Sequence, residues 1–502
     1  MSIKSSLAKP FANYIFNKIQ KGIATAVQDQ EAVLQQLIKV GKNTQFGKDH
    51  QFDSIKTYDD FKQQVPLRDY EGLKPYIEKI KEGKHNVLWK GKPLYFAKTS
   101  GTTSGVKYIP ISKDSIDNHI DTARNALLCY IAQKGNADFT KGKMIFLSGS
   151  PVLDRIAGIP TGRLSGIVNH HIPRYLRTNQ LPSYETNCIE DWETKLDAIV
   201  KETIQQDMTL ISGIPPWMQM YFDRLQAVSG KEIKELFPNF SVMVYGGVNF
   251  EPYKSKLFNT IGKTIDAIET FPASEGFFAF QDTIEHQGLL LNTASGIFYE
   301  FVPVAEIGTQ NPTRLCLKDV KKNKNYALII NSNAGLWGYD IGDTIKFVST
   351  NPYRLVVTGR TKHYISAFGE HVIAEEVEAA LMKAAAEENV HIVEFTVAPM
   401  VEQGKGKSYH EWFIEFAEAP KDMFAFAQNI DDNLRKKNAY YDDLISGAIL
   451  QKLKVRRVQK NGFINYMKSI GKLGGQNKLP RLSNDRTIVS QLESYLIEIE
   501  SL

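Results

Sequence analysis

The chain of 502 residues is 42% hydrophobic and 23% charged, which is typical of a globular protein with more than one domain. A net charge of +5, from 61 basic and 56 acidic side chains, argues against the concentrated basic surface of a nucleic-acid-binding protein. Because the three cysteines (Cys129, Cys188, Cys316) show no CxxC pairing and no apolar run suits a signal peptide or a membrane helix, we expect a cytoplasmic protein without structural zinc.

The first 90 residues alternate helix-forming stretches with polar breaks. Thr57 is a predicted helix cap, and Pro66 ends the helix that follows it. Further on, residues 116–130 have apolar side chains on one face of a predicted helix. The N-terminal region is therefore expected to be largely helical.

Three short apolar runs, each ending in a Ser/Gly turn, lie at residues 144–147, 209–211 and 242–245, and helical stretches separate them. Continuously apolar strands that alternate with helices predict a parallel sheet buried on both faces. Ligands of such sheets bind at the carboxyl ends of the strands, where these turns lie.

The pattern changes after about residue 289, where short strands joined by Asn, Gly and Pro turns indicate antiparallel pairing. A further α+β unit begins near Gly359 and Arg360. We therefore predict the α/β class, with a large N-terminal domain (1–361) of mixed and parallel sheets flanked by helices. A smaller, mobile α+β C-terminal domain (362–502) is expected to follow it.

The strongest local signal is Lys98–Lys107, which reads KTSGTTSGVK after an apolar strand. Hydroxyl groups, backbone amides exposed by glycine and a lysine suit a polyphosphate. The spacing excludes an ordinary P-loop, because Lys107 follows Gly105 by two residues and no Ser or Thr comes next. A flexible polar loop is the alternative.

Three further segments extend this pattern along the chain. Glu275 lies in the small-residue turn TFPASEG, Asp343 ends the tight turn YDIGD, and Arg360 and Lys362 belong to GRTK. Each segment alone is most often only a turn. Their joint order after the Ser/Thr/Gly loop indicates a nucleotide site.

Taken together, TSGTTSGVK, YDIGD and GRTKHYISAFGEHVIAEEVEAAL resemble motifs of the adenylate-forming enzymes, which include firefly luciferase and acyl-coenzyme A ligases. The chain is more closely similar to the acyl-acid amido synthetase family, known for plant enzymes that conjugate auxin or jasmonate to amino acids. That resemblance rests on an N-terminal signature, which runs from TQFGK at 44–48 to PYI at 75–77, and on GGQNKLPR at 474–481. Asp340, His371 and Asn477 depart from the plant motifs.

The resemblance implies a role for each matched residue. Four hydroxyl side chains would hold the ATP phosphates: Thr99, Ser100, Thr102 and Thr103. Gly246 and Gly247 would let the adenine lie against the backbone, and Asp343 with Arg360 would bind the ribose. Glu275 would help to hold Mg²⁺, Lys478 would neutralise charge at the α-phosphate, and Lys362 would mark the hinge.

The predicted function is an ATP- and Mg²⁺-dependent ligase that activates a carboxylic acid as an acyl-adenylate and joins it to an amine, with an amino acid favoured. An acyl-coenzyme A ligase and a non-catalytic nucleotide-binding protein are the alternatives. The expected partners are small molecules, without nucleic acid or membrane, and a monomer is favoured. Four aromatic residues near these motifs are expected in the core: Trp217, Phe277, Phe278 and Phe280.

Overall fold

The computed structural model describes residues 3–100, 106–172, 177–247, 250–361, 364–365, 372–400, 408–446, 450–474, 478–483 and 485–497. Its contacts divide the chain into two compact units. The first unit comprises Met1–Asn249 and Leu257–Val357, and the second comprises Phe250–Lys256 and Thr358–Leu502. The predicted α/β class, with a large N-terminal and a smaller C-terminal part, is confirmed.

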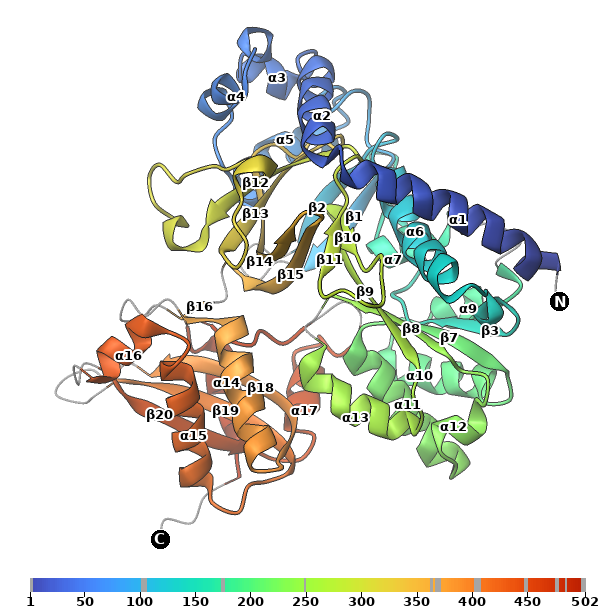
Figure 1. Cartoon of the computed structure of the whole chain (residues 1–502), viewed down its shortest axis with the longest axis vertical. Helices are drawn as coiled ribbons and strands as arrows, with labels where there is room; N and C mark the ends of the chain where they lie inside the picture. Colours follow the sequence, from blue (N-terminus) through green and yellow to red (C-terminus); the bar gives the residue numbers. More distant parts are fainter. Residues whose placement is uncertain are drawn as a thin grey trace. The chain divides into compact units, whose positions relative to one another are not determined.

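Helices form the N-terminal part of the first unit, as predicted. Thr57 and Asp60 make a capping box, in which the Thr57 side chain accepts from the Asp60 amide at 3.1 Å and Asp60 accepts from the Thr57 amide at 2.9 Å. Figure 1 shows α1 lying along α6. The helices are α1 (Ile3–Ile23), α2 (Ala26–Gly41), α3 (Gln45–Asp49), α4 (Tyr58–Gln64), α5 (Tyr70–Lys81) and α6 (Ile116–Lys134).

A small sheet of the first unit holds the strand before the Ser/Thr/Gly loop. Its order is β2-β1-β5-β4, with β1 antiparallel to β2 and parallel to β5. The pairing of Thr99 with Lys107 and of Ser100 with Val106 brings the two ends of the loop together. The strands are β1 (Tyr95–Ser100), β2 (Val106–Ile111), β4 (Asp154–Ile156) and β5 (Ile159–Gly162).

The other sheet of the first unit has eleven strands in the order β12-β13-β14-β15-β11-β10-β9-β8-β7-β3-β6. Its parallel part contains the three predicted apolar runs and is confirmed by the pairing of β3, β7, β8 and β9. These strands are β3 (Lys143–Phe146), β6 (Gln180–Leu181), β7 (Met208–Gly213), β8 (Val242–Gly246) and β9 (Asp266–Ala273).

The remaining strands pair antiparallel, as the Asn, Gly and Pro turns predict. They are β10 (Gly276–Phe280), β11 (Leu289–Leu291), β12 (Ile297–Pro303), β13 (Asn325–Ser332), β14 (Tyr339–Thr350) and β15 (Tyr353–Arg360). Phe277, Phe278 and Phe280 are buried, and so is Trp217, which confirms their expected place in the core.

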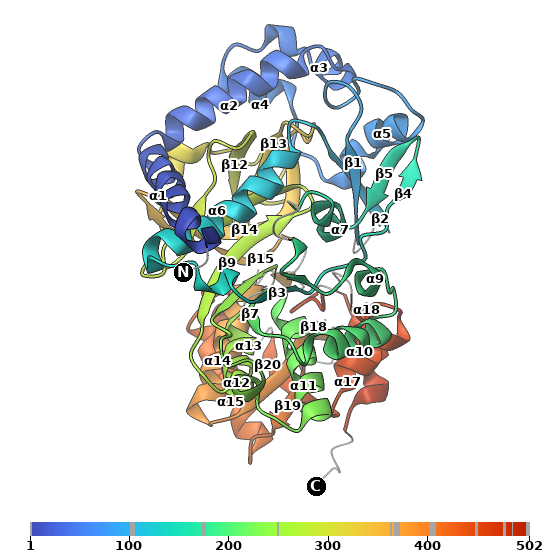
Figure 2. The same ribbon diagram turned by 90° about the vertical axis from the view of Figure 1, so that its right-hand side faces the viewer.

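Helices cover both faces of the parallel strands (Figure 2). On one face α1 and α6 pack against Leu210, Val242 and Ile268. On the other lie α10 and α11, where Trp192 contacts Trp217 with ring centroids 4.8 Å apart. The connecting helices are α7 (Leu164–Asn169), α9 (Tyr184–Asn187), α10 (Trp192–Thr203), α11 (Pro215–Ser229), α12 (Ile233–Leu236) and α13 (Glu251–Ile261).

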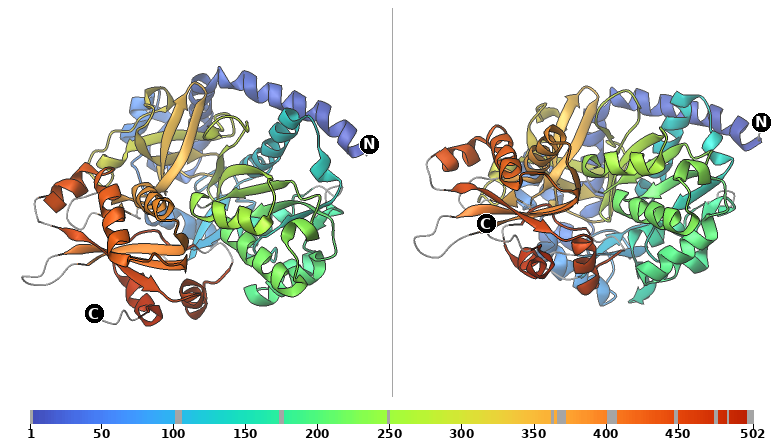
Figure 3. Two further views of the ribbon diagram at one scale, coloured as in Figure 1. Left: turned by 60° about the horizontal axis from the view of Figure 1, so that its bottom comes forward. Right: turned by 90° about the horizontal axis from the view of Figure 1, so that it is seen from below.

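The second unit is built on three strands, with β19 antiparallel to β18 and parallel to β20. Alternate side chains face opposite sides: Val397 and Trp412 pack with α14 and α15, whereas Ala398 and Phe413 pack with α17 and α18. Figure 3 shows the orange and red strands of this sheet with helices on both sides. The elements are β16 (Tyr364–Ile365), β17 (Val372–Ile373), α14 (Ala374–Glu387), β18 (His391–Met400), β19 (Tyr409–Glu418), α15 (Met423–Arg435), α16 (Ala439–Ser446), β20 (Gln451–Val458), α17 (Gly462–Ser469) and α18 (Thr487–Leu492).

Short 3₁₀ turns complete the two units. They are η1 (Phe52–Ser54), η2 (Asp138–Thr140), η3 (Val304–Glu306), η4 (Leu317–Asp319) and η5 (Glu493–Tyr495). In the part of the chain that the structure describes, no helix is both long enough and apolar enough to cross a membrane.

Candidate active site

The predicted phosphate loop runs between the paired ends of β1 and β2. Thr99 is half-buried and lies next to the end of β1, and Ser100 is the last residue of that strand. Lys98 forms an ion pair with Asp154 of β4, so the root of the loop is held by a neighbouring strand. Thr102 and Thr103 lie outside the described residues.

A series of tyrosines joins this loop to Glu275. The Lys107 ammonium lies 5.7 Å from the centre of the Tyr70 ring, and the Tyr108 amide donates to the Tyr70 hydroxyl at 3.0 Å. Two residues before Tyr70, the Arg68 amide donates to the Gly338 carbonyl at 2.8 Å and the Arg68 carbonyl accepts from the Asp340 amide at 2.9 Å, so this segment lies beside Tyr339. The Tyr339 hydroxyl donates to Oε1 of Glu275 at 3.3 Å. The structure therefore connects β2, the strand that follows the loop, with Glu275, the predicted Mg²⁺ ligand.

Tyr339 keeps its proton in this position. It is 1% exposed, and burial followed by the adjacent Glu275 carboxylate raises the pKa of Tyr339 well above its usual value. A hydroxyl that stays protonated can donate to the ionised carboxylate throughout the physiological pH range. Glu275 lies in the tight turn between β9 and β10, so the hydrogen bond also fixes its direction.

Glu275 fits a hard cation that is held mainly by a substrate. Mg²⁺ prefers carboxylate and phosphate oxygens and is commonly bound by one or two carboxylates together with phosphates. Among the residues described, no group of three or more His, Cys, Asp or Glu side chains is arranged to hold a metal ion by itself. One carboxylate directed by a tyrosine is consistent with an ion shared with ATP phosphates.

Gly246 and Gly247 end β8, one strand away from the segment that leads to Glu275. Gly246 pairs with Thr270 of β9, and the Thr270 hydroxyl donates to the Tyr245 carbonyl at 2.9 Å. A Cβ at Gly246 would lie 2.3 Å from the Thr270 carbonyl oxygen, which leaves no room for a side chain. Gly247 has a φ of +82° and is exposed, so backbone is accessible at this strand end.

Asp343 does not lie in a turn between two elements, and that part of the sequence prediction is wrong. The segment 339–343 is a bulge inside β14, because Ala327 pairs with Thr344 while Ile329 pairs with Asp340. Gly342 has a φ of +86°, and its amide donates to Oδ1 of Asp340 at 2.8 Å. Bulges re-aim side chains, and this one sets the direction of Asp343.

The segment around Lys478 belongs to the second unit. Lys478 is exposed, and the chain then joins the edge of β18, where the Val397 amide donates to the Arg481 carbonyl at 2.9 Å. Thr396 also donates to the Pro480 carbonyl at 2.7 Å. Arg360, also exposed, is the last residue of β15, whereas Lys362 and His371 lie outside the described residues.

Sequence reasoning overlooked two residues of this site. Tyr70 and Tyr339 connect the loop to Glu275, but a tyrosine in a motif of small and acidic residues usually indicates packing. Tyr339 is the first residue of YDIGD. In a strand its side chain and that of Asp340 point to opposite faces of the sheet, and this alternation of an apolar and an acidic residue was the available signal.

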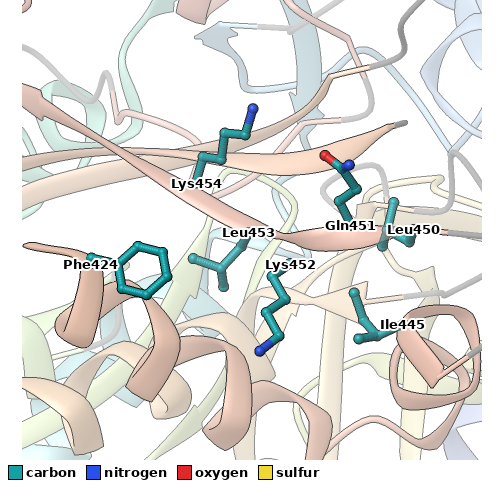
Figure 4. A pocket seen from close by; sticks show the side chains of 7 residues that line it. All are labelled: Phe424, Ile445, Leu450, Gln451, Lys452, Leu453 and Lys454. Atoms are coloured by element: carbon teal, nitrogen blue, oxygen red, sulfur yellow. The ribbon is translucent and has the colours of Figure 1, made fainter. Parts of the chain in front are cut away.

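A surface depression of about 440 Å³ in the second unit is not part of this constellation (Figure 4). Phe424, Leu450 and Leu453 supply its apolar lining, and the lysines Lys452 and Lys454 lie around it. None of the predicted site residues lines it, so we assign it no role in the chemistry.

Three profiles of one protein family match separate parts of the chain. The GH3 family N-terminal domain matches residues 15–181, the GH3 family central domain residues 290–360, and the GH3 family C-terminal domain residues 375–487. These ranges contain the β1–β2 loop, the bulge of β14 and most of the second unit.

Similar proteins match over nearly the whole chain. The jasmonoyl–L-amino acid synthetase JAR4 of Nicotiana attenuata is 21% identical over 93% of this chain and 93% of its own length. The indole-3-acetic acid-amido synthetase GH3.3 of Arabidopsis thaliana is 21% identical over 93% of this chain and 91% of its own.

Solved structures share the fold. The GH3.15 acyl acid amido synthetase superposes with a TM-score of 0.79 at 15% identity, covering 96% of both chains. A 2-hydroxyisobutyryl-CoA ligase in the postadenylation state superposes with a TM-score of 0.57 at 12% identity, covering 93% of this chain and 92% of its own. At these identities the structures establish the architecture alone.

Proposed function

Because the chain belongs to the GH3 family, we propose that it is an acid–amino acid ligase that activates a carboxylic acid with ATP and transfers the acyl group to an amine. The relatives that match over most of their length are amido synthetases for jasmonate and indole-3-acetate. The observation that carries the proposal is the series of hydrogen bonds from β2 to Tyr70, from the Arg68 backbone to the strand of Tyr339, and from Tyr339 to Glu275.

The proposed reaction has two steps, adenylation of the acid and transfer of the acyl group. An oxygen of the substrate carboxylate attacks the α-phosphorus of ATP, and pyrophosphate leaves with its electron pair. The amine nitrogen then attacks the acyl carbon, the bond to AMP breaks, and the proton of the amine passes to solvent. Splitting the reaction in this way replaces a poor leaving group with a good one.

We assign the first step mainly to the domain 1–361. Four hydroxyl groups of the loop would donate to the ATP phosphates: Thr99, Ser100, Thr102 and Thr103. Gly246 and Gly247 would border the adenine, Asp343 with Arg360 would bind the ribose hydroxyls, and Glu275 would hold Mg²⁺, which supplies positive charge to the phosphates.

The domain 362–502 would contribute Lys478 to the α-phosphate and turn about Lys362 between the two steps. Three observations are consistent with Lys478 in that role: it is exposed, it is cationic, and it lies three residues from Arg481, whose side chain is largely buried. A monomeric cytoplasmic protein suits a reaction whose substrates are all small molecules.

One experiment tests the adenylation step. We expect pyrophosphate release from ATP that depends on a carboxylic acid, in a screen of aromatic, fatty and hydroxy acids. Lys478→Ala should slow this release by about 100-fold, because a preorganised charge is removed. Lys472→Ala removes another exposed lysine of the same region and should have little effect. Near-normal release from Lys478→Ala would contradict the assignment.

A second measurement tests the transfer step. Product formation is followed by mass spectrometry with a mixture of amino acids and, separately, with coenzyme A. Amides formed with amino acids and no thioester formed with coenzyme A are the expected result. Thioester formation would identify an acyl-coenzyme A ligase, and nucleotide binding without pyrophosphate release would identify a non-catalytic protein.

A further inference from the structure

Lys195 is a buried cation in the first turn of α10. It is 2% exposed, and its ammonium donates to the carbonyl of Ser148 at 2.9 Å and to the carbonyl of Asn187 at 2.8 Å. Both acceptors are neutral. A cation in the first turn also opposes the helix dipole, so neither burial nor position stabilises this charge.

Arg163 brings a second cation to the same place. A Cβ built on Gly149 would lie 2.7 Å from Cδ of Arg163, so the arginine stem crosses the turn that follows Ser148. Burial, followed by the nearby Arg163, lowers the pKa of Lys195 to about 8. Within the described part of the chain, no carboxylate lies within ion-pair distance of either side chain, although Glu190 acts electrostatically on Arg163.

The residues around Lys195 carry polar side-chain atoms without partners. Ser148 Oγ, Asn187 Oδ1 and Trp192 Nε1 are buried and have no hydrogen-bond partner among the residues described. Ser148 and Asn187 are the residues that bind Lys195, and Trp192 lies one helical turn before it on the same face. Buried polar groups are normally paired, so these three atoms are available to hydrogen-bond a bound group.

The cluster lies at the carboxyl edge of the parallel strands, where ligands of such sheets bind. Ser148 follows β3, and β3, β7 and β8 are consecutive parallel strands. Two strand spacings, about 10 Å in all, therefore separate it from Gly246 along the same edge. Arg163 directly follows Gly162, which pairs with Ala97 of β1, so the cluster also adjoins the strand that leads to the loop.

Building on the proposed function, we propose that Lys195, Arg163 and Ser148 form a subsite for the α-carboxylate of the acceptor amino acid. Two cations and a hydroxyl that make no ion-pair contact with a carboxylate of the described residues are complementary to a bound carboxylate. The carboxyl group of the acyl donor loses its charge when it is adenylated, whereas the α-carboxylate of the acceptor stays ionised through both steps. Arg163 keeps its charge throughout, and a bound carboxylate favours the charged form of Lys195, so the pair suits a group whose own charge persists.

The test compares acceptors that differ only in this group. The full-length enzyme receives the acid that is most active in the pyrophosphate screen, with L-alanine, L-leucine, L-methionine or L-phenylalanine, or the α-carboxamide of each. We expect kcat/KM for the amino acids to exceed that for the carboxamides by about 10- to 100-fold. Arg163→Gln should reduce this ratio to below about threefold. Wild-type enzyme that does not distinguish acids from carboxamides overturns the subsite.

Matched variants exclude indirect effects. Arg155→Gln changes an exposed arginine of β4 and Lys201→Met an exposed lysine of α10, and both should keep the wild-type preference. Lys195→Met should lose it, and Arg163→Lys, which keeps the charge, should retain part of it. A preference that is unchanged in both Arg163→Gln and Lys195→Met overturns the assignment.

Pyrophosphate release without acceptor, measured on the same samples, separates the sources of the anion. If Arg163→Gln raises the KM of ATP or of the acid and leaves the acceptor preference intact, the cations bind a phosphate or the acyl donor, and the acceptor assignment is wrong. If no acid supports pyrophosphate release in the wild type, the proposed function fails, and the subsite assignment fails with it.

Discussion

Within the second unit, Nε of Arg481 donates to Oε1 of Glu378 at 3.1 Å, which ties the segment after Lys478 to helix α14. The same guanidinium pairs with Glu394 and donates to the Tyr253 hydroxyl at 2.6 Å. Its Cζ atom also lies 4.7 Å from the centre of the Phe395 ring. An arginine held on all sides in this way fixes the register of the chain that carries Lys478.

Replacing Arg481 should destabilise the second unit. Arg481→Ala leaves Glu378 and Glu394 without their common cation, and breaking such a buried pair typically costs about 3–5 kcal/mol. Arg457→Ala, an exposed arginine of β20, is the control and should cost less than about 1 kcal/mol. Urea denaturation of the full chain measures both. Equal stabilities of the two variants would show that the buried cluster contributes nothing.

Removing the Tyr339 hydroxyl should weaken the metal dependence of adenylation. Tyr339→Phe deletes the donor to Glu275, and a hydrogen bond to a charged group is worth about 1.5–3 kcal/mol, so the Mg²⁺ concentration for half-maximal pyrophosphate release should rise about tenfold. Tyr299→Phe removes another buried hydroxyl, which donates to the Asn292 carbonyl at 3.1 Å, and should leave the Mg²⁺ dependence unchanged. An unaltered Mg²⁺ requirement in Tyr339→Phe would remove the case for Glu275 as the ligand.

Gly246→Ala should destabilise the fold even without nucleotide. The added Cβ meets the Thr270 backbone carbonyl at 2.3 Å, and overpacking against backbone typically costs about 1–3 kcal/mol. Gly22→Ala, in helix α1 with nothing within 4 Å of the new Cβ, should be neutral or slightly stabilising. Thermal or urea unfolding of the apo protein distinguishes them. Wild-type stability of Gly246→Ala would mean that the strands separate readily there.

Lys195 should make stability depend on pH between about 8 and 10.5. In the folded chain burial, followed by Arg163, lowers its pKa to about 8, whereas Cys188 acts in the opposite direction. The unfolded chain therefore binds more protons than the folded chain in this window, and stability rises with pH. Compared with Lys195→Met, the wild type should gain on the order of 3 kcal/mol of unfolding free energy from the lower to the higher pH. Parallel pH profiles for the two proteins would contradict the lowered pKa.

Much of the fold follows from local patterns in the sequence. The apolar runs at β3, β7 and β8 are continuous because helices cover both faces of these strands, and continuity predicted their burial. The capping box at Thr57 is equally local, since both of its hydrogen bonds join residues three apart. Features of this kind need no knowledge of the tertiary structure.

Other features depend on the order of the strands in the sheet. Tyr339 and Glu275 are 64 residues apart, and the sheet places two strands, β15 and β11, between β14 and β10. Lys195 gave a weak signal, because it falls on the buried stripe of α10 with Trp192 and Ile199, where a lysine is unusual. The bulge at Gly342 differs from the predicted turn because Gly and Asp favour both structures.

The residues Phe250–Lys256 belong to the second unit although the chain on either side of them belongs to the first. The smaller part of the protein is therefore not one contiguous stretch of the gene. A chimera that joins 358–502 of this protein to the preceding part of a relative would lack Tyr253. Arg481 and Glu394 would then lose their hydrogen bonds with the Tyr253 hydroxyl. Recombination between members of this family is expected to give a folded protein more often when the codons for Phe250–Lys256 are exchanged together with those for the C-terminal segment.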